Sequence, residues 1–249
     1  MNIFLITTGL FAGILSGFFG VGGGTITVPM LIFFGLHIKE AIAISAFQMS
    51  FSSVFGSYIN HKNSVFDIKA SMPFLFGGAF GGVVGAYFTG IANETTLAVI
   101  LLIFMIFTIV KLFLSPAERE ASEEKNNPPL FFVIGLFIGA FGSSVGIGGA
   151  LLLTPVLVGF LGFGLKKAVG VTLFYVISTS LFAAGSFYLS GTLDMAKGIQ
   201  VAIPAVFGVY LGIYMASKTE AKKHKGLMLA LYLFITASLI FEFFWRSNG

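Results

Sequence analysis

Two glycine-rich runs interrupt long apolar stretches at matching places in the two halves of the chain. The first run reads Gly20-Val21-Gly22-Gly23 with Pro29 after it, and the second reads Gly146-Ile147-Gly148-Gly149 with Pro155 after it. The surrounding apolar stretches, 2–36 and 130–163, are longer than the ~20 residues that one membrane crossing needs. Paired, interrupted apolar segments of this kind indicate a transporter built from repeats, with its binding site at the interruptions.

The composition places the chain in a membrane. Hydrophobic residues make up 57% of the sequence and charged residues only 10%, whereas soluble proteins carry about 25% charged residues. Apolar runs of about 20 residues favour spanning helices over the ~10-residue strands of a barrel. We therefore expect an all-α polytopic membrane protein. It has no cysteine, which excludes disulfides and thiol chemistry.

The similarity between the halves continues beyond the glycine runs. Basic, acidic and proline residues recur in the same order, with Lys39-Glu40-Ala41 matching Lys166-Lys167-Ala168, Asp67 matching Asp194, and Pro73 matching Pro204. This shared order indicates a duplication. We expect a first repeat over 1–114, a charged cytoplasmic linker over 115–129 and a second repeat over 130–249, forming one membrane domain.

The distribution of Lys and Arg decides whether each interrupted segment crosses the membrane or returns to its starting side. If it crosses, the basic residues divide equally between the two sides. If it returns, one side keeps only Lys39, Lys197 and Arg246, and the excess on the other marks the cytoplasm. We therefore expect two inverted repeats, each a broken or re-entrant helical hairpin followed by three transmembrane helices. Both termini are then outside.

The interruptions are the candidate binding site. Non-helical backbone within a bilayer is tolerated only where protein buries it or where it lines a cavity. Glycine leaves backbone amides unshielded, and the start of the next helix favours negative charge. Two such starts approaching from opposite sides suit a small anion. The predicted site residues are Gly22, Gly23, Gly24, Thr25, Gln48, Ser143, Ser144, Gly148, Gly149 and Tyr175.

A packing role competes with binding for several of these residues. Glycines spaced four apart, such as Gly9, Gly13 and Gly17, are typical of close helix contacts, and we assign them to packing. Gln48 and Tyr175 occupy equivalent places in hydroxyl-rich spans. Such residues either line a pocket or join helices by hydrogen bonds, and the sequence leaves both readings open. Asn60 and His61 at a span end are expected to be interfacial.

Several functions are excluded by what the spans lack. All ten acidic residues fall in loops or at span ends, which disfavours a cation transporter or a proton relay. The run Gly142-Ser143-Ser144-Val145-Gly146 resembles a nucleophile elbow, but no histidine lies mid-span to act as its base. The glycine runs lack the Gly-Lys-Ser/Thr ending of a nucleotide-binding loop. We expect no enzyme activity, no catalytic residue, no metal and no cofactor.

The chain resembles the TauE/SafE family of sulfite exporters, also called sulfonate uptake permeases. The resemblance rests on Gly17-Phe18-Phe19-Gly20-Val21-Gly22-Gly23-Gly24 with Pro29, on the second copy from Gly146 to Pro155, and on the two-half hydropathy. It covers essentially the whole chain. The second copy departs from the first by having Ala150 in place of Gly24, so the two half-sites need not bind alike. The resemblance implies secondary transport of sulfur-containing anions across the bacterial inner membrane.

These observations lead to one principal hypothesis and two alternatives. The principal hypothesis is a secondary transporter that holds one small sulfur-containing oxyanion at the two glycine breaks and works by alternating access. A passive anion channel is the first alternative, and an intramembrane hydrolase using Ser144 is the second. The expected partners are a small anionic substrate and the lipid bilayer, with no nucleic acid; a homodimer is left open.

Overall fold

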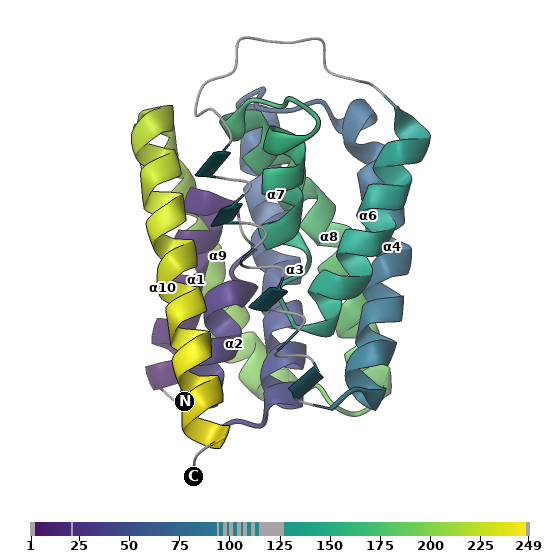
Figure 1. Cartoon of the computed structure of the whole chain (residues 1–249), viewed down its shortest axis with the longest axis vertical. Coiled ribbons are helices and arrows are strands. Elements are labelled where there is room, and N and C mark those ends of the chain that lie inside the picture. Colours follow the sequence, from purple (N-terminus) through teal and green to yellow (C-terminus); the bar gives the residue numbers. More distant parts are fainter. Residues whose placement is uncertain are drawn as a thin grey trace.

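The computed structural model describes residues 3–20, 22–93 and 127–247, together with a few single positions between 95 and 114. In these ranges every regular element is a helix (Figure 1). The helices are α1 (Ile3–Phe19), α2 (Gly24–Phe33), α3 (Ile38–Lys62), α4 (Ile68–Ile91), α6 (Pro128–Ser144), α7 (Ala150–Gly159), α8 (Leu165–Leu189), α9 (Met195–Ser217) and α10 (Ala221–Ser247). About half of residues 95–114, at the end of the expected first repeat, and most of the expected linker 115–129 lie outside the described residues.

Helices α3, α4, α8 and α9 are long and apolar enough to cross a membrane, which confirms the prediction of an all-helical, multi-pass membrane protein. The arms of the interrupted segments are shorter. Helices α2 and α7 have ten residues each. At 1.5 Å per residue they reach about 15 Å, roughly half the hydrocarbon thickness of a bilayer.

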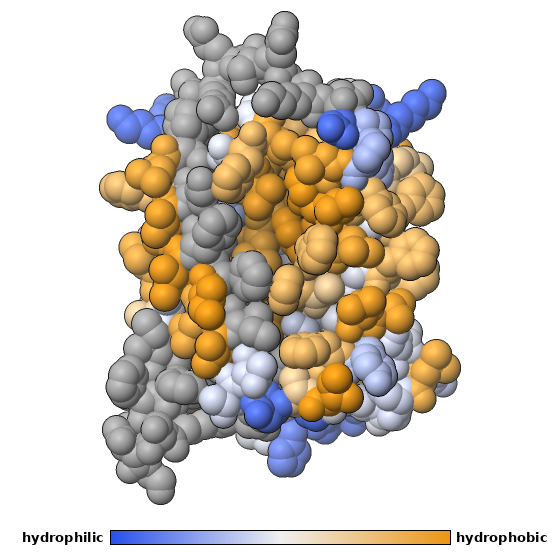
Figure 2. Space-filling view, turned by 45° about the vertical axis from the view of Figure 1, so that its right-hand side comes forward, coloured by the Kyte–Doolittle hydropathy of each residue, from blue (hydrophilic) through white to orange (hydrophobic). Residues whose placement is uncertain are grey.

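The surface agrees with a membrane environment. On the face shown in Figure 2, hydrophobic residues cover the middle of the molecule and hydrophilic residues gather towards its two ends. Large apolar side chains are exposed on several helices, including Phe80 on α4, Phe137 on α6 and Phe207 on α9. A bilayer provides the apolar surroundings that water would not.

The matched aspartates cap matched helices. Asp67 precedes α4, and its side chain accepts a hydrogen bond of 2.9 Å from the amide of Lys69. Asp194 precedes α9 and accepts one of 3.1 Å from the amide of Lys197. An aspartate in this position satisfies an amide that the helix itself leaves without a partner. Their recurrence in both halves therefore has a local structural cause.

The helices pack reciprocally between the halves. Helix α1 of the first half lies along α9 of the second, and α6 of the second half lies along α4 of the first, while α3 and α8 contact each other at the centre. Small residues allow the outer pairs to approach closely. A Cβ on Gly13 would overlap the Ala205 carbonyl oxygen of α9, and a Cβ on Gly77 would overlap the Phe132 carbonyl oxygen of α6. The glycines that the sequence assigns to packing therefore lie at helix contacts.

The two interrupted segments lie in opposite halves of the bundle. The N- and C-termini are at the same end, whereas α6 begins at the other end (Figure 1). The short arm α2 lies in the half nearer the termini, and α7 lies in the opposite half (Figure 1). Both breaks are thus carried into the interior of the molecule, between helices that cover them.

Candidate functional site

Three matching glycines in each break have similar positive φ angles. The φ angles are +70°, +75° and +80° at Gly20, Gly22 and Gly23, and +75°, +61° and +76° at Gly146, Gly148 and Gly149. This left-handed region costs a residue with a side chain roughly 1–2 kcal/mol. Each break therefore requires its glycines for conformation as well as for space. Val21 lies outside the described residues.

The breaks contact each other directly. A Cβ on Gly24 would overlap the carbonyl oxygen of Gly146, and one on Gly22 would lie 3.4 Å from the Cβ of Ala150. Met49 of α3 and Val176 of α8 lie beside both breaks, at 3.2–3.4 Å from the Cβ positions of Gly22 and Gly148. The two helix starts therefore meet in the interior, as the sequence predicts.

Gln48 and Tyr175 each lie against the glycine that precedes a short helix. The Gln48 amide is 3.1–3.2 Å from the Cβ position of Gly23, and the Tyr175 hydroxyl is 2.9 Å from that of Gly149. Both side chains already have partners. Gln48 Nε2 donates to Ser52 Oγ at 3.0 Å, and the Tyr175 hydroxyl donates to the Gly135 carbonyl at 2.9 Å. The first bond lies within α3, and the second joins α8 to α6.

Two of the predicted hydroxyls have no partner. Thr25 and Ser143 are only 3% and 2% exposed, and neither hydroxyl oxygen hydrogen-bonds to any residue that the structure describes. The Ser144 hydroxyl instead donates to the Phe141 carbonyl at 2.7 Å, a bond within its own helix. A buried polar group without a partner costs about 1–3 kcal/mol. Of the predicted site residues, Thr25 and Ser143 are therefore the two whose hydroxyls have no partner within the described part of the chain.

Hydroxyl groups satisfy the carbonyl oxygens around the second break. Ser45 donates to Gly146 at 2.8 Å, Thr179 donates to Gly148 at 2.9 Å, and Thr89 donates to Ser144 at 2.8 Å. The sequence marks the spans of Ser45 and Thr179 as rich in hydroxyls but gives no signal for Thr89. These bonds satisfy the carbonyl oxygens of the break, including that of Gly146, which faces Gly24 of the first break.

Two backbone amides at the second break have no hydrogen-bond acceptor among the described residues. Among the described residues, the backbone amides of Gly149 and Leu151 donate to no hydrogen-bond acceptor. Both belong to the start of α7, where a helix carries partial positive charge. Over the same described residues, no group of three or more His, Cys, Asp and Glu could hold a metal ion. The chemistry available at the breaks is that of neutral hydrogen-bond donors.

Comparisons with known proteins agree with this architecture. A family model described as "Sulfite exporter TauE/SafE" matches residues 5–239. The probable membrane transporter protein YunE of Bacillus subtilis is 25% identical over 96% of this chain and 97% of its own length. A probable membrane transporter protein of Methanocaldococcus jannaschii is 26% identical over 92% and 91%, respectively. No solved structure matches the chain.

Proposed function

The chain belongs to the TauE/SafE sulfite exporter family of membrane transporters, and we propose that it carries one small sulfur-containing oxyanion, such as sulfite or a sulfonate, by secondary transport. The observation that supports this most is the direct contact between the two glycine breaks in the interior. Two helix starts meet there, and each contributes partial positive charge of about half a unit. Backbone amides and the hydroxyls of Thr25 and Ser143 would bind the anion.

The absence of charge at the breaks favours an anion over a cation. No ionisable carboxylate or amine belongs to the predicted set of binding residues, and cation paths through membranes are usually marked by such groups. Unshielded amides at a helix start bind anions without a counter-charge. Enzyme function is not required by any of these features, and the name of the family indicates transport.

We further propose that the halves are inverted repeats that exchange two conformations. The reciprocal packing of α1 on α9 and of α6 on α4 supports a pseudo-two-fold relation in the membrane plane. From the distribution of Lys and Arg we expect both termini to lie outside a bacterial inner membrane. Each repeat would in turn open the breaks towards its own side.

Burial of the site favours a transporter over a passive channel. Gln48 and Tyr175 are fully buried, and Thr25 and Ser143 nearly so. The Met49 side chain lies between the breaks. An anion can therefore pass from one side of the membrane to the other only after some helices move, and that requirement limits flux to one anion per conformational cycle.

Uptake of labelled sulfite into proteoliposomes tests this function. We expect uptake that saturates with concentration and that exchanges labelled for unlabelled anion against a gradient. Large ohmic currents that rise linearly with concentration would identify the channel instead. A complete lack of sulfite and sulfonate transport by folded protein would contradict the proposed substrate class.

The variant Thr25→Val tests the hydroxyl in the same assay. A hydrogen bond to a charged group contributes about 1.5–3 kcal/mol, so the half-saturation concentration should rise roughly tenfold or more. Folding should be unaffected because the hydroxyl has no partner among the described residues. Thr7→Val is the matched control, since Thr7 is exposed and bonds only to carbonyls of its own helix. Equal half-saturation in both variants would remove Thr25 from the site.

A further inference from the structure

One face of α3 remains polar from the breaks to the end of the helix. Towards the lipid, α3 exposes large apolar side chains, namely Phe51, Val54, Phe55 and Tyr58. Towards the interior it buries polar ones, namely Ser52, Ser53, Ser57 and Asn60. Spacings of three and four residues place the buried set in one row along the helix. The row begins one turn beyond Gln48 and Met49, which contact the breaks.

The last two members of this row lack partners. Ser57 is 4% exposed and Asn60 is 6% exposed, and neither the Ser57 hydroxyl nor the Asn60 amide nitrogen is hydrogen-bonded within the described part of the chain. Ser53 differs, because its hydroxyl donates to the Ser50 carbonyl at 3.3 Å. Asn60 is also buried rather than interfacial, contrary to the expectation from sequence. A buried polar atom without a partner costs about 1–3 kcal/mol, and water or a polar solute in contact with it would remove that cost.

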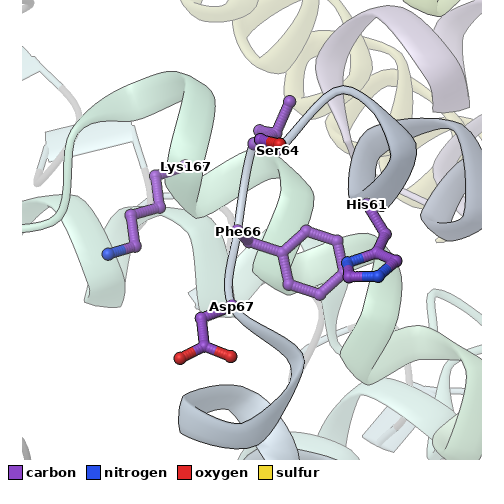
Figure 3. A pocket seen from close by; sticks show the side chains of 6 residues that line it. His61, Ser64, Phe66, Asp67 and Lys167 are labelled. Atoms are coloured by element: carbon purple, nitrogen blue, oxygen red, sulfur yellow. The ribbon is translucent and has the colours of Figure 1, made fainter.

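A pocket lies at the end of α3 and begins at His61, the residue after the row. The pocket has a volume of about 410 Å³ and is lined by His61, Ser64, Val65, Phe66, Asp67 and Lys167. In Figure 3 the side chains of Lys167 and Asp67 lie on one side of the Phe66 ring, and His61 lies on the other. This end of the bundle is opposite to the two termini (Figure 1). An anion leaving the breaks along α3 would therefore meet the Lys167 ammonium.

The equivalent route in the second half is apolar. An offset of 127 residues, set by Asp67 and Asp194, pairs Ser57 with Ala184 and Asn60 with Phe187. Ala184 and Phe187 are buried side chains of α8, 5% and 3% exposed. No polar row therefore continues along α8 to the end of the bundle that carries the termini.

Charged side chains form ion pairs at the end of the bundle that carries the termini. Lys167 corresponds to Glu40, and Glu40 accepts a hydrogen bond of 2.6 Å from the Lys197 ammonium, which is also 3.5 Å from Asp194. The backbone amide of Lys197 lowers the pKa of Asp194, and the nearby ammonium lowers it further. These ion pairs occupy the positions that correspond, each in the other half, to Asp67 and Lys167 of the pocket.

We infer that the buried face of α3, through Ser57 and Asn60 to the pocket at His61 and Lys167, is the hydrated half-path between the glycine breaks and one side of the membrane. This inference rests on the proposed function and extends it to the route of the anion. The path opens on the side opposite to the termini, which the Lys and Arg distribution places in the cytoplasm. The conformation described is closed towards the other side.

Single cysteines test the path in a chain that has none of its own. Ser57→Cys and Asn60→Cys are each treated with a membrane-impermeant, negatively charged methanethiosulfonate, in inside-out and in right-side-out vesicles. We expect both to react from the cytoplasmic side, at least tenfold faster than the matched control Ala184→Cys. His61→Cys, in the pocket, verifies that the reagent reaches this end.

The labelling experiment tests the path independently of the proposed substrate. Equal rates for Ser57→Cys and Ala184→Cys, or no reaction of Ser57→Cys and Asn60→Cys while His61→Cys reacts, would overturn the inference. The readout needs no transport. Asymmetric labelling in a protein that does not move sulfite would therefore reject the proposed substrate and retain the path. The near-isosteric change at Ser57 and the second variant at Asn60 guard against a folding defect.

Discussion

Alanine at Gly149 should reduce the initial rate of sulfite uptake about a hundredfold or more per folded molecule. Gly149 has φ +76°, which costs alanine roughly 1–2 kcal/mol. Its new Cβ would lie 2.8 Å from the Ile138 carbonyl oxygen and 2.9 Å from the Tyr175 hydroxyl. Since a contact below 3 Å forces one partner to move, the start of α7 would shift. Misplacing groups at a binding site by about 1 Å can cost a hundredfold in rate.

Two further variants make this result interpretable. Gly23→Ala should cause a comparable loss, because Gly23 has φ +80° and lies against the Gln48 amide. Gly185→Ala is the control, since nothing lies within 4 Å of its Cβ position. It should transport normally and be stabilised by about 0.5–1 kcal/mol, as expected for a glycine inside a helix. Uptake by Gly149→Ala within twofold of the unmodified protein would remove the second break from the site.

Leucine at Gly13 should prevent most of the protein from folding. The Cβ of residue 13 would overlap the Ala205 carbonyl oxygen and lie 2.8 Å from the Ala205 Cα. The obstacle is backbone, so α1 must separate from α9 along its length. Overpacking a core costs typically 1–3 kcal/mol when side chains can yield, and more is expected here. The measurements are the monodisperse yield in detergent and the midpoint of thermal unfolding.

Gly185→Leu is the matched control for this effect. It introduces the same side chain into α8 at a position with open space around the Cβ. Its yield and unfolding midpoint should remain close to those of the unmodified chain. If Gly13→Leu were equally stable, the close approach of α1 and α9 would not contribute to the fold.

The elements were largely predictable because composition and spacing determine them. The two breaks fall between Phe19 and Gly24 and between Ser144 and Ala150, where the glycine runs predict them. A glycine run stops a helix whatever its surroundings, and lipid requires apolar helices of defined length. Both constraints depend on short stretches of sequence, so they can be recognised without a structure.

The hydrogen bonds of the site were not predictable. Gln48, Tyr175 and Ser144 belong to the predicted site, and each donates to another group of the protein. Which carbonyl a hydroxyl or amide reaches depends on helix rotation and rotamer, to within a few tenths of an ångström. Asn60 was misjudged for a related reason. Its place near a span end suggested an interface, but the rotation of α3 turns it inwards.

A calorimetric titration of the purified protein with sulfite tests the paired site most directly. If both breaks together hold one anion, the stoichiometry is one per chain, and Gly23→Ala and Gly149→Ala each abolish binding, whereas Gly185→Ala retains it. Two independent sites per chain, or full binding by either break variant, would contradict a shared site.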